Sequence, residues 1–220
     1  RALGMSKEDI LRTFYNELEV KIEGDGYVFT LSELLNGKAV AEDIVDPKGG
    51  EVLLRAGRKL TRASIKRMSA ARIKQVRLDL EELLGQGIAE DIVDESTGEI
   101  GYELNSDITE DVLKDLRERG VRSFKVFHVD KAYADNTIRD TLVLDRTGSP
   151  DEALLTIYKR MRPGDPSTSA TTKAFFDNLL FNAKRYDLSK IGRLKLNTKL
   201  DLDFDLDQRV LTQDDIIGAI

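Results

Sequence analysis

The hexapeptide Ala41-Glu-Asp-Ile-Val-Asp46 recurs as Ala89-Glu-Asp-Ile-Val-Asp94, 48 residues further along the chain. The same offset then holds without a gap through the apolar positions that follow, pairing Ile65 with Leu113, Met68 with Leu116 and Ile73 with Val121. An ungapped match of apolar positions predicts two copies of one structural unit. We expect these copies over about residues 38–82 and 87–130.

The pattern within each copy predicts the order strand, turn, strand, helix, strand. The expected strands lie at 38–46, 51–54 and 75–80 in the first copy and at 87–94, 99–102 and 123–129 in the second, with turns at 47–50 and 95–98. Thr61 and Thr109 each precede a helix and can cap it, because a hydroxyl accepts a bond from an otherwise unpaired N–H of the first turn. Together the copies predict an α+β module over residues 30–135.

Helices are predicted on both sides of this module. Before it, a helix starting after Ser6 places Ile10, Leu11, Phe14 and Leu18 on one face. After it, a helix begins at Ser149 or Asp151 and ends at Arg162-Pro-Gly164, because proline lacks the helical donor and glycine permits a turn. A second helix is expected from about Ser169 to Asn182. The fold class is therefore α+β, with segments 1–29 and 136–220 flanking the module and the latter mainly helical.

Composition narrows the class of protein. The 220 residues are 40% hydrophobic, which is enough to bury a core. The chain has no cysteine and a single histidine, so disulfides and thiolate metal sites are excluded, and His128 is expected to be an ordinary strand side chain. No apolar run is long enough to span a bilayer and no signal pattern opens the chain, so we expect a cytoplasmic protein. Arg1 and the helix start near the C-terminus suggest a segment of a longer polypeptide.

Charge divides the chain into two parts. The net charge is −6, yet residues 159–199 hold ten Lys and Arg against three Asp. This segment is locally cationic, and the rest of the chain is correspondingly acidic. A cationic segment can gain affinity for phosphates through counterion release, whereas the acidic part would be repelled by them.

Three short sequence motifs in the second half of the chain resemble motifs of one known family. They are Tyr158-Lys-Arg-Met-Arg-Pro-Gly-Asp-Pro166, Arg185-Tyr-Asp-Leu-Ser189 and Gly192-Arg-Leu-Lys-Leu-Asn197. In this order and spacing they resemble the lobe of the bacterial RNA polymerase beta subunit. The resemblance implies that 1–29 and 136–220 are the two parts of a lobe, and that 30–135 is a lineage-specific insertion of sandwich-barrel-like modules.

The same resemblance implies the activity and the partners. The chain would form part of the wall of the DNA channel, without a complete active site, so the isolated segment would be inactive. It implies as partners the remainder of beta, the beta-prime, alpha and omega subunits, sigma factor and DNA, with regulators possible on the repeats and no membrane. It also implies a nucleoid-associated location and no cofactor in this segment, the Mg²⁺ belonging to the complete polymerase.

Nucleic-acid contacts are predicted for basic residues of the cationic segment. Guanidinium groups bind phosphate through paired N–H bonds, while lysines act as point charges. The candidates are Arg160, Arg162, Arg185, Arg193, Lys195 and Lys199. Alternatives stay open: Arg185 can pair with Asp187, and the stems of Arg160 or Arg162 can pack over a helix end. The aromatic residues of 175–181 have helical spacing, which favours core packing over base stacking.

No catalytic or metal-binding residue is predicted. Asp203-Phe-Asp205-Leu-Asp207 contains three carboxylates that a tight loop could converge on Mg²⁺, but their alternation favours an extended, solvated segment. Two other functions remain as alternatives: a non-enzymatic protein-docking module built on the repeats, and a metal-dependent phosphotransferase using residues 201–207.

Overall fold

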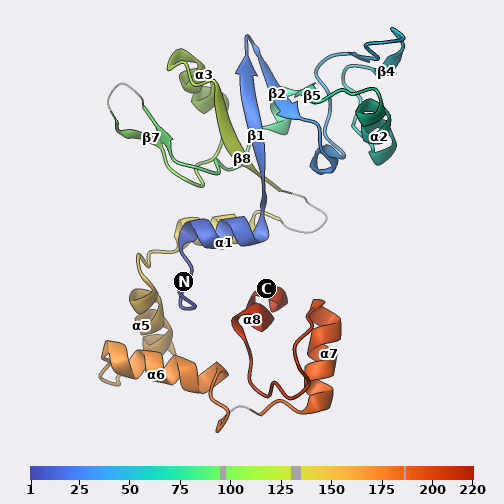
Figure 1. Ribbon diagram of the computed structural model, residues 1–220. Helices are drawn as coiled ribbons and strands as arrows, with labels where there is room; N and C mark the ends of the chain where they lie inside the picture. Colours follow the sequence, from blue (N-terminus) through green and yellow to red (C-terminus); the bar gives the residue numbers. More distant parts are fainter. Residues whose placement is uncertain (95–97, 130–134, 186) are drawn as a thin grey trace. The chain divides into compact units, whose positions relative to one another are not determined.

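The structure is a computed structural model that describes residues 1–94, 98–129, 135–185 and 187–220 (Figure 1). It mixes helices and strands, which confirms the α+β class. The chain forms two compact units. We call residues 8–145 the sheet unit and residues 1–7 with 146–220 the helical unit.

A four-stranded antiparallel sheet organises the sheet unit. Its strand order is β5 (Gln75–Leu78), β2 (Gly26–Thr30), β1 (Asn16–Glu23), β8 (Ser123–His128). The hairpin β1–β2 therefore forms the centre of the sheet. The predicted helical position of Leu18 is wrong, because helix α1 (Lys7–Phe14) ends earlier and Leu18 is buried in β1.

Two segments with matching elements extend from the sheet on either side of the central hairpin. The first contains β3 (Ile44–Val45), β4 (Val52–Leu54) and α2 (Arg62–Ala70) and ends in β5; the second contains β6 (Ile92–Val93), β7 (Ile100–Tyr102) and α3 (Glu110–Glu118) and ends in β8. We call residues 38–78 the first repeat and residues 86–126 the second repeat. Short 3-10 helices precede them at Glu33–Leu35 and Leu80–Glu82. Figure 1 shows β4 and α2 beyond the β5 edge, with β7 and α3 beside β8.

The expected strands at 38–46 and 87–94 are shorter than predicted. Only β3 and β6 are ladders, and the residues before them form isolated bridges, Val40 with Leu78 and Ile88 with Val126. Within the expected turn at 95–98, residues 95–97 lie outside the described residues. The two bridges are again 48 residues apart, so the short pairings also recur between the repeats.

Left-handed backbone conformations recur at the same offset. Positive φ angles occur at four positions in each repeat or just before it, pairing Gly37 with Gly85, Gly50 with Gly98, Gly57 with Asn105 and Arg72 with Gly120. The predicted caps are confirmed: the Thr61 side chain accepts a bond from the Ser64 N–H, and Thr109 accepts one from Val112. The backbone of the two repeats therefore follows one set of turns and helix starts.

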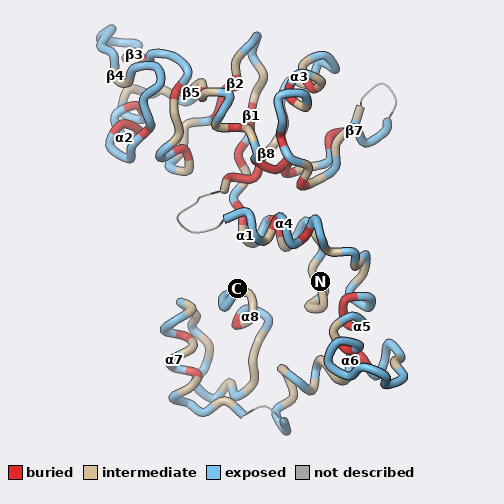
Figure 2. The backbone as a smooth tube through the Cα atoms, turned by 180° about the vertical axis from the view of Figure 1, so that it is seen from behind, coloured by how far each residue is buried: buried red, intermediate tan, exposed pale blue. Residues whose placement is uncertain are grey.

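The core of the sheet unit is continuous through both repeats. Figure 2 shows buried residues along the strands of the sheet. Phe29 of β2 and Phe124 of β8 are among the buried core residues. Helix side chains from both repeats join it, with Met68 from α2 and Leu116 from α3 fully buried. A second, smaller cluster packs α1 and α4 (Thr137–Leu144) together through Leu11, Tyr15, Phe127 and Leu142.

The helical unit contains α5 (Pro150–Met161), α6 (Ser169–Leu180), α7 (Lys190–Leu200) and α8 (Gln213–Ala219). Ser149 caps α5 as predicted, and α6 begins at the predicted residue. The aromatic residues of α6 are half-buried: Phe175 meets Tyr158 of α5 edge to face, with ring centroids 5.3 Å apart. In the part of the chain that the structure describes, no helix is long and apolar enough to cross a membrane.

Candidate nucleic-acid interface

Two of the candidate arginines lie where α5 ends. Arg160 is exposed in the last turn, and Arg162 is the C-cap residue, whose N–H donates to the Tyr158 carbonyl. The Arg162 guanidinium lies 5.3 Å from the Phe175 ring centroid and 3.8 Å from an Asp165 oxygen. Its side chain keeps 55% of its surface exposed, so stacking on Phe175 orients the guanidinium without removing it from solvent.

Lys195 and Lys199 share the exposed side of α7. They are four residues apart and therefore one turn apart on the same face of the helix. Ser189 caps α7 by accepting a bond from the Gly192 N–H. Lys190, at the start of the helix, is instead paired with Asp207 at 2.6 Å, and this hydrogen bond raises its pKa.

Arg193 lies on the opposite side of α7 and is completely buried. Its guanidinium donates to both carboxylate oxygens of Asp215, at 2.7 and 2.8 Å, and to the carbonyls of Gln208 and Val210. The predicted DNA contact of Arg193 conflicts with this geometry, because its donors are engaged inside the unit and its side chain has no exposed surface for a phosphate. These hydrogen bonds of Arg193 connect α7 to α8 and to the segment between the two helices.

Asp215 is the residue that explains this burial. Burial by itself would raise the pKa of Asp215, but hydrogen bonds from Arg193 and from Thr212 hold it below its usual value. Thr212 and Asp215 also form a capping box at the start of α8, in which each side chain accepts a bond from the other residue's N–H. The spacing Thr-x-x-Asp was visible in the sequence, but the buried arginine partner was not.

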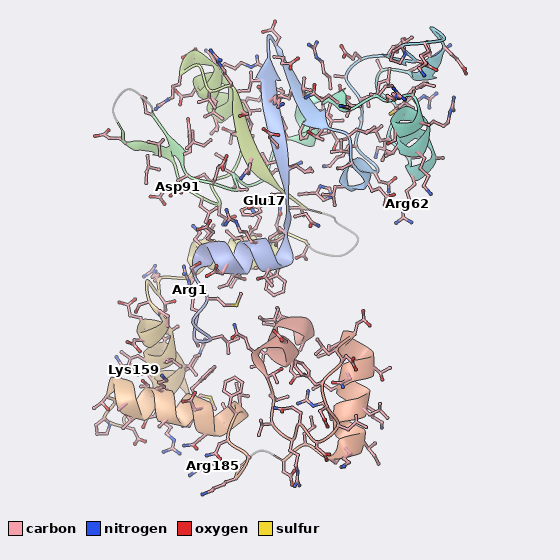
Figure 3. The ribbon with its side chains drawn as sticks, viewed as in Figure 1. Arg1, Glu17, Arg62, Asp91, Lys159 and Arg185 are labelled. Carbon is pink, nitrogen blue, oxygen red and sulfur yellow. The ribbon has the colours of Figure 1, made fainter. Side chains whose placement is uncertain are left out.

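Arg185 lies in the turn after α6 and is exposed. The alternative pairing of Arg185 with Asp187 is wrong, because Asp187 binds both Nε and Nη2 of Arg209 at 2.7 and 2.6 Å. Figure 3 labels Arg185 in this turn and Lys159 on α5. Thus five predicted side chains stay exposed, in three places: the end of α5, the turn after α6 and one face of α7.

The acidic segment 201–207 forms no strand, but its four aspartates are exposed, in agreement with the predicted solvated segment. Asp201 ends α7 in a left-handed conformation, and the Asn197 amide donates to the Phe204 carbonyl at 2.7 Å. Asp207 pairs with Lys190, and the Asp207 N–H donates to the Asp205 carboxylate. Side chains of α7 thus hold this segment against the helix. His128, as expected, is a buried side chain at the end of β8.

Comparison with known proteins identifies the family. The model described as RNA polymerase Rpb2, domain 2, matches residues 110–220, half of the chain. The DNA-directed RNA polymerase subunit beta of Geobacter sulfurreducens is 45% identical over 221 residues, covering all of this chain and 16% of that protein. The same subunit of Anaeromyxobacter sp. (strain Fw109-5) is 43% identical over 217 residues, covering 98% of this chain and 15% of that protein.

The chain is therefore a member of the Rpb2 domain 2 class of polymerase domains. Within that class it belongs to the family of bacterial RNA polymerase beta subunits, to which it is similar over its whole length. It spans about 15% of the length of the relatives it matches.

Proposed function

We propose that this chain forms part of the DNA-channel wall of a DNA-dependent RNA polymerase, as a segment of the beta subunit. The observation that carries the proposal is the match to beta subunits along the whole chain. The exposed cations of the helical unit support it, since DNA phosphates are bound through exposed, unburied Lys and Arg. The proposed contacts are Arg160, Arg162, Arg185, Lys195 and Lys199.

The finer assignments belong to the same proposal. Residues 1–29 and 136–220 form the two parts of the lobe, and the two repeats within 30–135 form a lineage-specific insertion of sandwich-barrel-like modules. The partners are the rest of beta, beta-prime, alpha, omega, sigma factor and DNA, at the nucleoid in the cytoplasm. Nucleotidyl transfer and its Mg²⁺ belong to the complete polymerase, and this segment contributes binding and positioning.

Charge reversal on the exposed cations tests the proposal. In the complete polymerase, Arg185→Glu, Lys195→Glu and Lys199→Glu together should shorten the lifetime of the promoter open complex and make its salt dependence shallower by about 0.9 for each phosphate that is no longer neutralised. The matched control exchanges the charges of the ion pair on the same helix, Lys190→Glu together with Asp207→Lys, because this variant keeps the pair and its net charge. Lifetimes equal to those of the unchanged enzyme across a salt series would contradict the proposal.

A protein-docking role of the repeats is the second candidate. Each repeat exposes an apolar cross-strand pair on its small hairpin, Val45 opposite Val52 in the first and Val93 opposite Ile100 in the second. A cleft of about 890 Å³ beside the second hairpin is lined by residues of β6, β7 and the start of β8. Exposed apolar groups beside a cleft are typical of protein-binding surfaces.

A deletion of the unit that carries the repeats distinguishes the DNA-wall role from the docking role. The structure determines where the deleted segment should begin and end. Removing residues 30–135 would leave β1 and β2 without β5 and β8, so the excision should instead join Lys7 to Arg146 at the unit boundary. The docking role predicts a polymerase that keeps basal RNA synthesis but loses stimulation or inhibition by a regulator. Loss of basal synthesis would contradict a purely docking role of this unit.

A further inference from the structure

The two repeats carry opposite charge on the same backbone. The first repeat holds eleven Lys and Arg against four Asp and Glu, a net charge of +7, whereas the second holds five against eleven, a net charge of −6. The expectation that everything outside 159–199 is acidic is therefore wrong for the first repeat. A difference of this size between copies of one backbone is not needed by the fold, because both repeats form the same elements.

The reversal is concentrated on one run of exposed positions. In the first repeat the loop before α2 and the first turns of that helix expose five cations, which we call the cationic strip: Arg55, Arg58, Lys59, Arg62 and Lys66. The residues 48 positions later are Glu103, Ser106, Asp107, Glu110 and Lys114. Four of the five cations are thus replaced by acidic or neutral residues in the second repeat, and only Lys66 and Lys114 agree.

The side chains of the cationic strip are exposed. Among the described residues no ion pair joins any of the five to a carboxylate, whereas Arg67 next to them pairs with Glu51 and Arg77 with Glu23 and Glu42. Figure 3 shows Arg62 projecting from the start of α2. An unpaired, exposed run of five cations sustains a strong positive potential.

Arg62 also stands where the helix itself disfavours a cation. It is the first residue of α2, after the cap Thr61, and no acidic residue occupies that first turn. The N-terminus of a helix carries partial positive charge, which favours the Glu110 and Asp111 that begin α3. A residue that opposes the local electrostatics of its helix indicates a requirement outside the fold.

We infer that the cationic strip of the first repeat binds the phosphate backbone of duplex DNA, as a second nucleic-acid surface apart from the helical unit. Protein partners bind through buried aromatic or apolar anchors surrounded by a polar rim. None of the exposed large hydrophobic residues of the described chain lies between Arg55 and Lys74. Phosphate contacts need no such anchor, because their affinity comes from charge neutralisation and counterion release.

The inference rests on the proposed function only for the presence of DNA beside this chain. The internal repeat supplies its control, because Lys66 and Lys114 occupy equivalent positions on surfaces of opposite charge. A photoreactive benzoylphenylalanine placed at Lys66 of the complete polymerase, bound to a long promoter fragment, should crosslink to DNA, and the same residue placed at Lys114 should not. A Lys66 crosslink to protein alone, equal DNA crosslinking from both sites, or no crosslink from either would overturn the inference.

A charge-reversal variant gives the second readout. With Arg58→Glu, Arg62→Glu and Lys66→Glu, the log–log salt slope of binding to promoter-free duplex DNA should become shallower by about 0.9 for each phosphate that is no longer neutralised. All three side chains are exposed, and Arg62→Glu introduces the residue that the second repeat holds at that position. Lys114→Glu is the control and should leave the slope unchanged. If this variant is silent while the Arg185, Lys195 and Lys199 reversal is not, the strip inference fails and the proposed function stands.

Discussion

The first and second repeats have the same turns, caps and pairings but differ in what contacts them. In the second repeat, Arg139 of α4 is buried against Asn105, Asp107 and the Gly85 carbonyl, at 2.8, 2.6 and 3.1 Å. At the corresponding positions of the first repeat, Gly57 has no side chain where Asn105 accepts a bond, and Lys59 is a cation where Asp107 is an anion, while Gly37 is a glycine like Gly85. One repeat is thus modified to receive a helix of its own chain, and the other presents charge to solvent. The two repeats therefore share their backbone geometry, while their side chains set the contacts of each.

Arg193 is a buried arginine, and we expect its substitution to cause the largest loss in the free energy of unfolding. Arg193→Ala leaves the carboxylate of Asp215 buried without its partner, which costs about 3–5 kcal/mol. The control is Arg209→Ala, because its pair with Asp187 is more than half exposed and should contribute at most about 1 kcal/mol. Urea unfolding of the helical unit, followed by circular dichroism, measures both. Equal losses for the two variants would show that burial of the pair is unimportant.

Acid should weaken the same buried pair. The pKa of Asp215 is lowered in the folded chain, so its contribution is fully present above its unfolded value and is lost as pH falls through the lower folded value. Stability of the helical unit should therefore decline below about pH 4. Asp215→Asn should flatten this part of the pH profile, measured as unfolding midpoints from pH 6 to pH 2. If Asp215→Asn left the decline of stability at low pH unchanged, the result would contradict a stabilising Arg193–Asp215 pair.

Arg139→Met removes the contacts that distinguish the second repeat from the first. The apolar chain fills similar space but leaves Asn105 and the Gly85 carbonyl without a donor, so the sheet unit should lose about 1–3 kcal/mol. Lys59→Met, at the first-repeat position equivalent to Asp107, is exposed and should change stability by less than about 0.5 kcal/mol. If both variants had the same effect in urea unfolding, the second repeat would not be specialised to receive α4.

Gly87 lies against the Arg139 guanidinium, and adding a side chain there should destabilise the fold through steric overlap, by a smaller amount. A Cβ at Gly87 would lie 2.5 Å from the Arg139 guanidinium, which is held by its partners, so Gly87→Ala should cost about 1–2 kcal/mol. The equivalent residue in the first repeat is Ala39, where Ala39→Gly should cost only about 0.5–1 kcal/mol through added chain entropy. In the Arg139→Ala background the Gly87→Ala penalty should disappear. A penalty that persists there would assign it to the backbone instead.

Substitutions in the left-handed turns after α2 and α3 should cause the smallest changes in stability. Arg72 has φ of 64° and its counterpart Gly120 has φ of 75°. Gly120→Arg should therefore destabilise the chain by about 1 kcal/mol, and Arg72→Gly should be neutral or stabilising by a smaller amount. Thermal unfolding of the paired variants measures both. Opposite signs to these would show that the two turns are not equivalent.

The sequence predicted those parts of the fold that depend on local spacing. It did not predict the parts that depend on contacts between residues far apart in the chain. The 48-residue offset, the Thr caps and the helices of the helical unit all follow from spacing. The strict alternation of Leu18, Val20 and Ile22 is a strand signal that would have found β1, had the helix not been extended over it. Without β1 and β2, the sheet that joins the repeats could not be derived.

The candidate site was predictable in part for the same reason. Exposed cations at the end of α5 and on one face of α7 follow from composition and helical spacing. The burial of Arg193 does not, because it depends on Asp215, 22 residues away. The alternation over 201–207 correctly predicted exposed aspartates. It could not predict that Asn197 and Arg193 bind backbone carbonyls of the following segment and hold it against α7.

The proposed function requires that this chain occurs within an RNA polymerase. Antibody capture from the source cell, followed by peptide mass mapping of the captured polypeptide and an assay of its activity, tests that claim most directly. We expect a polypeptide several times longer than 220 residues, recovered together with DNA-dependent RNA synthesis. A free chain of about this length, recovered without that activity, would contradict it.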